Sequence, residues 1–273
     1  MFEEFRRKER EGWGAKAGQY ADHTALITTQ AIPTLLAAAR VRAGSEVLDI
    51  CTGPGYAAGA AKAICAYATG VDFAPQMVHA ARANFPGCTF VEGDALRLDF
   101  EDARFDAAIC PFGIFHVTEP AQAISEAHRV LRPGGRYAFS QWCAPAESDF
   151  FRITMGAIAK HADMSVADPA PNAFALSDRE ACRALMDETG FRDVQVREVP
   201  SVYHAPEGDF FDNIMHLTVR GAMIIELQTD EVVQRIRDEM NAAAREYETE
   251  DGIVVPVPSF VVSGRKAASA EEA

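Results

Sequence analysis

Three carboxylates in the first half of the chain come at the ends of short apolar runs. Asp49 ends the first of these runs and is followed by Gly53 and Gly55, while Asp72 and Asp94 follow later ones. A strand that ends in a carboxylate, then a glycine turn and a helix, is the arrangement in which an open α/β sheet binds a nucleotide-like ligand. The spacing therefore predicts a ligand site at the carboxyl edge of a parallel sheet.

The acid before the glycine turn indicates the kind of ligand. A carboxylate directed into the loop repels the pyrophosphate of a dinucleotide, but it accepts hydrogen bonds from a cationic amine. S-adenosylmethionine carries such an amine and no phosphate. Gly53 and Gly55 would let the backbone approach it closely, and Pro54 stiffens the turn. An NAD(P)-dependent oxidoreductase is the alternative, because Gly59 completes a loose glycine pattern.

The elements that must position these side chains alternate between strand and helix with short connections. This alternation predicts an α/β fold with a doubly wound, mostly parallel, seven-stranded Rossmann-like sheet. The predicted strands are 47–50, 68–73, 89–92, 105–110, 135–141, 194–199 and 253–262, and the predicted helices of the sheet region are 56–68, 75–85 and 120–131.

Segments outside this alternation predict additions to the sheet. We expect an amino-terminal helical arm (1–43), a methyl-donor-binding domain (44–265) with helical lid insertions at about 144–176 and 204–250, and a disordered tail (266–273). The predicted helices of these additions are 150–162, one capped by Ser177 and Glu180 that ends at Gly190, 210–227 and 230–247. Pro256 and Pro258 place the last strand at an edge or a bulge.

Composition narrows the classes of partner. Lys and Arg number 26 against 40 Asp and Glu, so the net charge of −14 opposes binding to a nucleic acid. No apolar run approaches the roughly 20 residues of a membrane helix, and the charged residues 1–10 do not resemble a secretory signal. The six cysteines have no spacing typical of a metal site or a disulfide framework. We expect a cytoplasmic protein with a small-molecule acceptor, no membrane association and no metal.

Four ordered stretches carry a resemblance to a known family. They are 47–56, 70–77, 92–96 and 130–136, the last containing Pro133-Gly134-Gly135. In these stretches the chain resembles the class I S-adenosylmethionine-dependent methyltransferases, in the small-molecule group that includes the ubiquinone and menaquinone C-methyltransferases. Cys51 stands where the family usually has a glycine, which is tolerable if this position does not need a positive φ.

The resemblance implies roles for several residues in cofactor binding. Asp72 would bind the ribose hydroxyls, although an acid there could instead cap the following helix. Asp94 and the backbone N–H of Ala95 would bind the adenine edge. The remaining residues implied at the cofactor are Tyr20, Phe73, Met77, Leu96 and Cys110, the last as a wall residue rather than a nucleophile.

A second set of residues is predicted to form the acceptor pocket. His116 follows the fourth strand, and histidine ordinarily titrates near neutrality, so it is the candidate general base. Trp142 offers a flat wall for a planar compound. Phe115, His23 and Tyr203 complete this predicted pocket, the last two on position alone.

These observations predict methyl transfer to oxygen or carbon of a planar or conjugated small molecule by in-line displacement, with S-adenosylhomocysteine as product. Methylation of nitrogen or sulfur stays open, since a neutral amine or a thioether need not lose a proton before it attacks. A catalytically silent, cofactor-binding regulatory subunit is a third hypothesis. Adjacent aromatic residues such as Phe150 and Phe151 cannot face the same way, so one of them is free to line a pocket or a homodimer interface.

Overall fold

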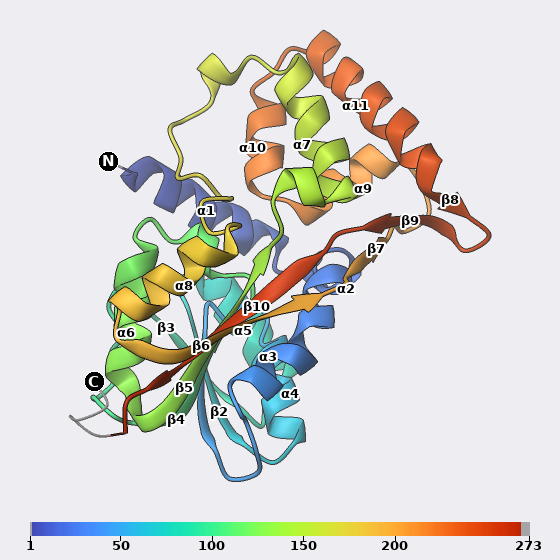
Figure 1. The fold of residues 1–273 in the computed structure, drawn as a ribbon. Helices are drawn as coiled ribbons and strands as arrows, with labels where there is room; N and C mark the ends of the chain where they lie inside the picture. Colours follow the sequence, from blue (N-terminus) through green and yellow to red (C-terminus); the bar gives the residue numbers. More distant parts are fainter. Residues whose placement is uncertain (1, 269–273) are drawn as a thin grey trace.

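The main feature of the fold is a seven-stranded sheet (Figure 1). The structure is a computed structural model, and it describes residues 2–268. The strand order is β3-β2-β1-β4-β5-β10-β6. The strands β1 to β5 pair in parallel, so their carboxyl ends lie at one edge. The predicted α/β sheet is thereby confirmed. Its strands are β1 (Glu46–Ile50), β2 (Tyr67–Asp72), β3 (Thr89–Glu92), β4 (Phe105–Cys110), β5 (Leu131–Trp142), β6 (Phe191–Val199) and β10 (Ser259–Lys266).

The last predicted strand, 253–262, is two strands, and its expected place at an edge or a bulge is wrong, because the two prolines mark the break between these strands. Its first half belongs to β9 (Gly252–Pro256), and its second half to β10, which lies between β5 and β6 and is antiparallel to both. Pro256 ends β9 and Pro258 precedes β10, so neither proline removes a ladder N–H from the inner strand. Lys266 is the last residue of β10, while 269–273 lie outside the described residues.

Helices cover both faces of the sheet (Figure 1). On one face, side chains such as Val47 pack against α3 (Ile32–Ala38), α4 (Tyr56–Ala63) and α5 (Pro75–Asn84). On the other face, side chains such as Leu48 pack against α6 (Pro120–Val130) and α8 (Arg179–Glu188). Neighbouring strand residues point to opposite faces, so these apolar runs feed two separate cores. Asp178, not Ser177, caps α8, because its carboxylate accepts the N–H groups of Glu180 and Ala181.

The amino-terminal arm crosses the carboxyl edge of the sheet. It consists of α1 (Glu3–Lys16), η1 (Tyr20–Asp22), α2 (Ala25–Thr28) and η2 (Thr29–Ala31), and it leads into α3. Arg10 of α1 forms an ion pair of 2.5 Å with Glu92 at the end of β3. The arm therefore lies over the loops that follow the strands.

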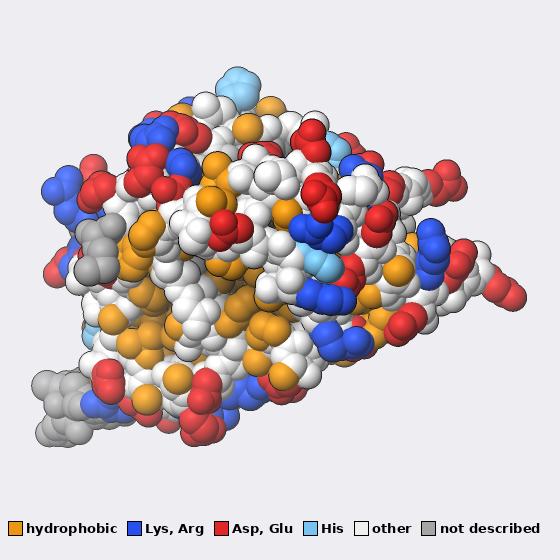
Figure 2. Space-filling model, turned by 90° about the horizontal axis from the view of Figure 1, so that it is seen from above, with side chains coloured by type: hydrophobic (Ala, Val, Ile, Leu, Met, Phe, Trp, Pro, Cys, Tyr) orange, Lys and Arg blue, Asp and Glu red, His pale blue; other side chains and the backbone are white. Residues whose placement is uncertain are grey.

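A helical layer forms a third core above that edge (Figure 1). The predicted helix 210–227 is two helices, interrupted at Thr218 and Val219. The layer contains α7 (Asp149–His161), α9 (Phe210–Leu217), α10 (Arg220–Glu226) and α11 (Asp230–Ala244), with a second sheet of β7 (Val202–His204), β9 and β8 (Glu248–Thr249) beside it. Short 3₁₀ turns are η3 (Ile114–His116), η4 (Pro145–Glu147), η5 (Met164–Val166) and η6 (Arg245–Tyr247). Figure 2 shows hydrophobic side chains gathered in the middle of the upper face, with charged ones around them.

Candidate active site

A cavity of about 240 Å³ lies between the carboxyl edge of the sheet, α1 and the helical layer. Residues predicted from the loops after β1, β2, β3 and β4, from the end of β5 and from the arm line it together, although they are far apart in the sequence. At the end predicted for the cofactor these are Tyr20, Gly53, Asp72, Phe73, Met77, Asp94, Ala95 and Leu96, and at the end predicted for the acceptor Phe115, His116 and Trp142.

Asp49 lies behind the glycine loop and does not line the cavity. It is fully buried, and its Oδ2 accepts hydrogen bonds from Thr52 Oγ1 at 2.7 Å and from the N–H of Ala58 at 2.9 Å. Burial raises the pKa of Asp49 to about 7, partly offset by these two bonds. Its Oδ1 is buried without a hydrogen-bond partner among the described residues. Asp49 thus holds the loop onto α4, and its direct contact with a ligand stays a prediction.

The loop requires a left-handed backbone at the position where the family pattern has glycine. Cys51 has φ +55°, so the condition under which a residue other than glycine is tolerated here without strain is not met. Gly55 has φ +88°, and a Cβ there would lie 2.8 Å from the ring of Phe90. A hydrogen bond with Cys110 and burial raise the pKa of the Cys51 thiol well above its ordinary value. The thiol therefore stays protonated and acts as a wall of the cavity.

Asp72 joins the first two loops of the site. Its Oδ2 accepts the N–H of Gly53 and its Oδ1 accepts the N–H of Ala74, each at 2.9 Å. Burial raises the pKa of Asp72 to about 6, although these backbone bonds favour the ionised form. The two roles considered from the sequence are compatible, because the carboxylate orders the turn before α5 while it also lines the cavity.

Asp94 is engaged by the arm as well as by its own loop. Its Oδ1 accepts the N–H of Leu96 at 2.9 Å, and its Oδ2 is paired with the guanidinium of Arg6 from α1. This ion pair could not be anticipated from the sequence, because 88 positions separate the two residues. The carboxylate predicted to bind adenine is therefore also the point at which α1 contacts the cofactor end.

Tyr20 is held in place by aromatic packing. Its ring stacks on Tyr56 with centroids 6.0 Å apart, and its hydroxyl lies 3.3 Å from Thr28 Oγ1. Burial raises the pKa of Tyr20 to about 12, so the phenol is neutral and unsuited to act as a base.

The acceptor end is strongly apolar. The indole of Trp142 stacks on Phe112 with centroids 3.9 Å apart and meets Phe151 edge to face at 5.7 Å. The helical layer and the segment before α8 supply most of the rest of this wall, including Phe150, Met155, Ile158, Phe174, Ile214 and Leu217. Such a surface suits a flat, apolar molecule.

Besides Asp49, five predicted site residues lie outside the walls of this cavity. Pro54 lines a smaller adjoining cavity, Gly55 is the N-cap residue of α4, and Cys110 is buried beneath the glycine loop. His23 faces away and stacks on His216, with centroids 4.8 Å apart. Tyr203 is fully buried between Phe150 and Phe210, because β7 belongs to the core of the helical layer. His23 and Tyr203 are therefore not in the acceptor pocket that we expected.

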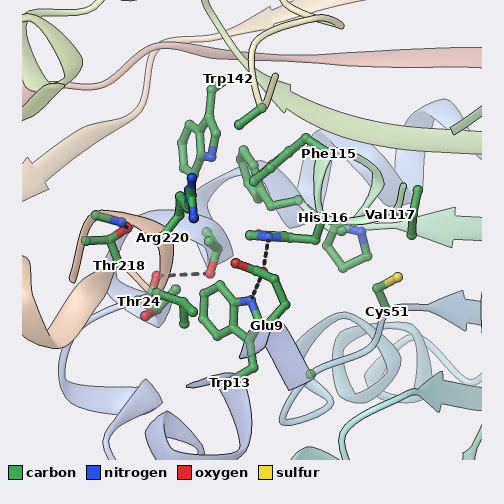
Figure 3. Close-up of a pocket in the computed structure, with 18 of the residues that line it drawn as sticks. Glu9, Trp13, Thr24, Cys51, Phe115, His116, Val117, Trp142, Thr218 and Arg220 are labelled. Carbon is green, nitrogen blue, oxygen red and sulfur yellow. Dashed lines mark hydrogen bonds and ion pairs between the residues drawn. The ribbon is translucent and has the colours of Figure 1, made fainter. Parts of the chain in front are cut away.

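Sequence reasoning missed Glu9 and Trp13 of α1. Both line the cavity, and Figure 3 shows the carboxylate of Glu9 between the imidazole of His116 and the indole of Trp13. Their spacing of four residues, one helical turn, is a weak signal that many surface helices share. Only the packing of α1 across the sheet edge reveals that they belong to the site.

Comparisons with known proteins agree with this geometry. A family profile described as "Methyltransferase domain" matches residues 48–139, which run from β1 to β5. A demethylmenaquinone methyltransferase of Deinococcus radiodurans is 36% identical over 163 residues, which cover 54% of this chain and 68% of that protein. The chain belongs to the class I S-adenosylmethionine-dependent methyltransferases. This membership argues against the oxidoreductase alternative.

The extent of similarity differs among relatives of this methyltransferase. A demethylmenaquinone methyltransferase of Chlorobaculum tepidum is 41% identical over 91 residues, and the match spans only 38% of that protein. A solved structure of a Haemonchus contortus phosphoethanolamine N-methyltransferase in complex with S-adenosyl-L-methionine has a TM-score of 0.54 at 18% identity, covering 88% of this chain and 52% of that one. At this identity the likeness concerns the fold alone.

The residues of the cavity fit the methyl donor of the family. A buried oxygen of Asp49 lacks a partner behind the loop, and the carboxylates of Asp72 and Asp94 face the cavity with apolar neighbours between them. S-adenosylmethionine offers ribose hydroxyls, an adenine amine and an ammonium as donors to such acceptors. In residues 2–268 no group of three His, Cys, Asp or Glu side chains is placed to hold a metal ion, and no helix has the length and apolarity to span a membrane.

Proposed function

We propose that this methyltransferase transfers the methyl group of S-adenosylmethionine to oxygen or carbon of a small, planar or conjugated acceptor. The observation that carries the proposal is one cavity with two chemically different ends. Asp72 and Asp94 lie at one end, the apolar wall around Trp142 at the other, and His116 lies on the same lining.

At the cofactor end, Asp72 would accept hydrogen bonds from the ribose hydroxyls. Asp94 and the backbone N–H of Ala95 would bind the adenine edge. Phe73 and Met77 would enclose the ring, and Tyr20 would cover it from the arm. When bound, S-adenosylmethionine supplies a methyl group on a sulfonium, which leaves as S-adenosylhomocysteine.

At the acceptor end, the aromatic and aliphatic wall would align a flat molecule and exclude water. Alignment supplies a large share of the barrier reduction in such a transfer. The name of the relatives, demethylmenaquinone methyltransferase, supports a conjugated ring as acceptor. The net charge of −14 favours a small molecule over a nucleic acid.

His116 would act as the general base. It accepts a proton from an acceptor hydroxyl as that oxygen, or the ring carbon it activates, forms its bond to the methyl carbon and the carbon–sulfur bond breaks. The proton then passes to solvent. Methylation of a neutral amine or thioether would not use this step, so dependence on His116 separates the two classes of acceptor.

The decisive experiment supplies labelled S-adenosylmethionine with hydroquinones, phenols, amines and thiols of similar size. We expect label on the hydroquinones or phenols, and a fall in turnover of about 10²-fold or more in His116→Ala with nearly unchanged affinity for S-adenosylhomocysteine. Transfer only to amines or thiols, whatever its dependence on His116, would refute the acceptor assignment. Cofactor binding without transfer to any acceptor would instead favour a silent subunit.

A further inference from the structure

We infer that Glu9 is a positioning residue that sets the tautomer of His116 and stabilises its protonated form during methyl transfer. This inference rests on the proposed function, in which His116 is the base. Glu9 precedes the domain that the family profile matches, residues 48–139.

The contacts of Glu9 determine which ring nitrogen of His116 carries the proton. Glu9 Oε2 lies 2.8 Å from His116 Nδ1 and accepts the indole N–H of Trp13 at 2.9 Å (Figure 3). An ionised carboxylate only accepts, so Nδ1 carries the proton and Nε2 keeps its lone pair. No described residue makes a hydrogen bond to Nε2, and the side chain lines the cavity. The base nitrogen is thereby left for the acceptor.

The burial of the Glu9 carboxylate destabilises the folded state, so a functional role would explain its presence there. Its side chain is only 1% exposed, and its Oε1 is buried without a partner among the described residues. An unpaired buried oxygen destabilises a fold, because it loses its hydrogen bonds to water without replacing them. A fixed negative charge beside the imidazole offsets the positive charge that the ring gains when it takes the proton.

Rings on two sides fix the orientation of His116. Trp13 meets the imidazole edge to face with centroids 5.1 Å apart, and the ring of Phe115 lies at 4.3 Å. The Trp13 indole therefore packs against the imidazole and also donates a hydrogen bond to Glu9, the partner of that imidazole. Rotation of His116 would break the bond to Glu9 and displace both rings.

Helix α1 couples this pair to the cofactor end. Arg6, one turn before Glu9, is paired with Asp94, and Lys8 is paired with Asp168. The contact between Glu9 and His116 thus forms only when α1 is docked across the sheet edge.

The test compares Glu9→Gln with Glu11→Gln, an exposed acid on the same helix. With the acceptor found in the labelling screen, we expect Glu9→Gln to lower kcat by about 10²-fold, with KM and the affinity for S-adenosylhomocysteine within about threefold of the original protein. Glu11→Gln should match the original in all three. Combining Glu9→Gln with His116→Ala should add no further loss, since the two act as one unit.

A measurement without turnover keeps the inference separate from the proposed function. In protein labelled with ¹⁵N at histidine, the neutral His116 ring should carry its proton on Nδ1, and Glu9→Ala, which removes the acceptor altogether, should abolish this preference. A proton on Nε2 in the original protein, or equal kcat in the two glutamine variants, would overturn the role of Glu9. If no acceptor is methylated while the Nδ1 proton is observed, the proposed function fails and the placement of His116 by Glu9 stands.

Discussion

Asp72 makes cofactor affinity depend on pH. Burial raises its pKa to about 6, and only the ionised carboxylate accepts from two backbone N–H groups and from ribose hydroxyls together. Affinity for S-adenosylhomocysteine should therefore increase from pH 5 to pH 7 and then level off. Titration calorimetry across this range measures the effect.

The variant Asp72→Asn should bind S-adenosylhomocysteine about 1.5 to 3 kcal/mol more weakly at pH 8 and lose this pH dependence. Asp99→Asn, at an exposed acid in the loop after β3, should keep both properties. An unchanged affinity in Asp72→Asn would remove the ribose assignment.

Cys51 carries a backbone cost that other residues would increase. Its φ of +55° is left-handed, which costs a residue with a Cβ about 1 to 2 kcal/mol and is worse for a β-branched one. In urea unfolding, Cys51→Val should lower the free energy of unfolding, because a β-branched side chain adds strain to the cost that Cys51 already bears, and Cys51→Gly should raise it by up to about 1 to 2 kcal/mol. Cys88→Val, at a negative φ, serves as the control. Equal losses at both cysteines would contradict this account of the loop.

At the scale of elements, two glycines of α1 allow this helix to pack closely against its neighbours. A Cβ on Gly12 would lie 2.5 Å from Val219 Cγ1, and one on Gly14 would lie 2.6 Å from Gln76 Oε1. These contacts bring the helix close to α5 and to the start of α10. The position of Glu9 over the cavity follows from this close approach.

Gly12→Val should therefore weaken the docking of α1. Overpacking costs about 1 to 3 kcal/mol, so affinity for S-adenosylhomocysteine should fall roughly 5- to 150-fold. Gly156→Ala tests the opposite case, because nothing lies within 4 Å of a Cβ there in α7. That variant should bind normally and gain about 0.5 to 1 kcal/mol of stability. Normal binding by Gly12→Val would show that the arm does not contribute to the cofactor site.

At the scale of the whole molecule, the buried Asp49 should reduce stability as pH rises. Burial raises its pKa to about 7 in the folded state, above the ordinary value of 3.8, so the folded protein holds a proton that the unfolded chain has released. The free energy of unfolding then decreases between pH 4 and pH 7 and the loss is complete above pH 7.

Relative to Asp49→Asn, the original protein should lose up to about 4 kcal/mol across this window. The comparison with the variant cancels the contribution of the other acidic residues. Urea unfolding of both proteins at several pH values measures it. A constant difference between them would mean that Asp49 ionises at its ordinary pH despite its burial.

The amino-acid sequence alone was sufficient to predict the sheet from β1 to β5 and the loops that follow these strands. Each element there is a local pattern of apolar residues with its own turn, and parallel strands joined by helices bring their carboxyl ends to one edge. This is why the order and spacing of Asp72, Asp94 and His116 along the chain were enough to assign them to one site.

What closes the site depends instead on packing in three dimensions. That packing places β10 inside the sheet despite its flanking prolines, buries Tyr203 in the helical layer, gives Cys51 a left-handed backbone and brings Glu9 to His116 across 107 positions. Such contacts join elements far apart in the chain, whereas sequence periodicity reports only on neighbours a few residues away. The meeting of the loop residues at one cavity could therefore be predicted, and the contact between Glu9 and His116 could not.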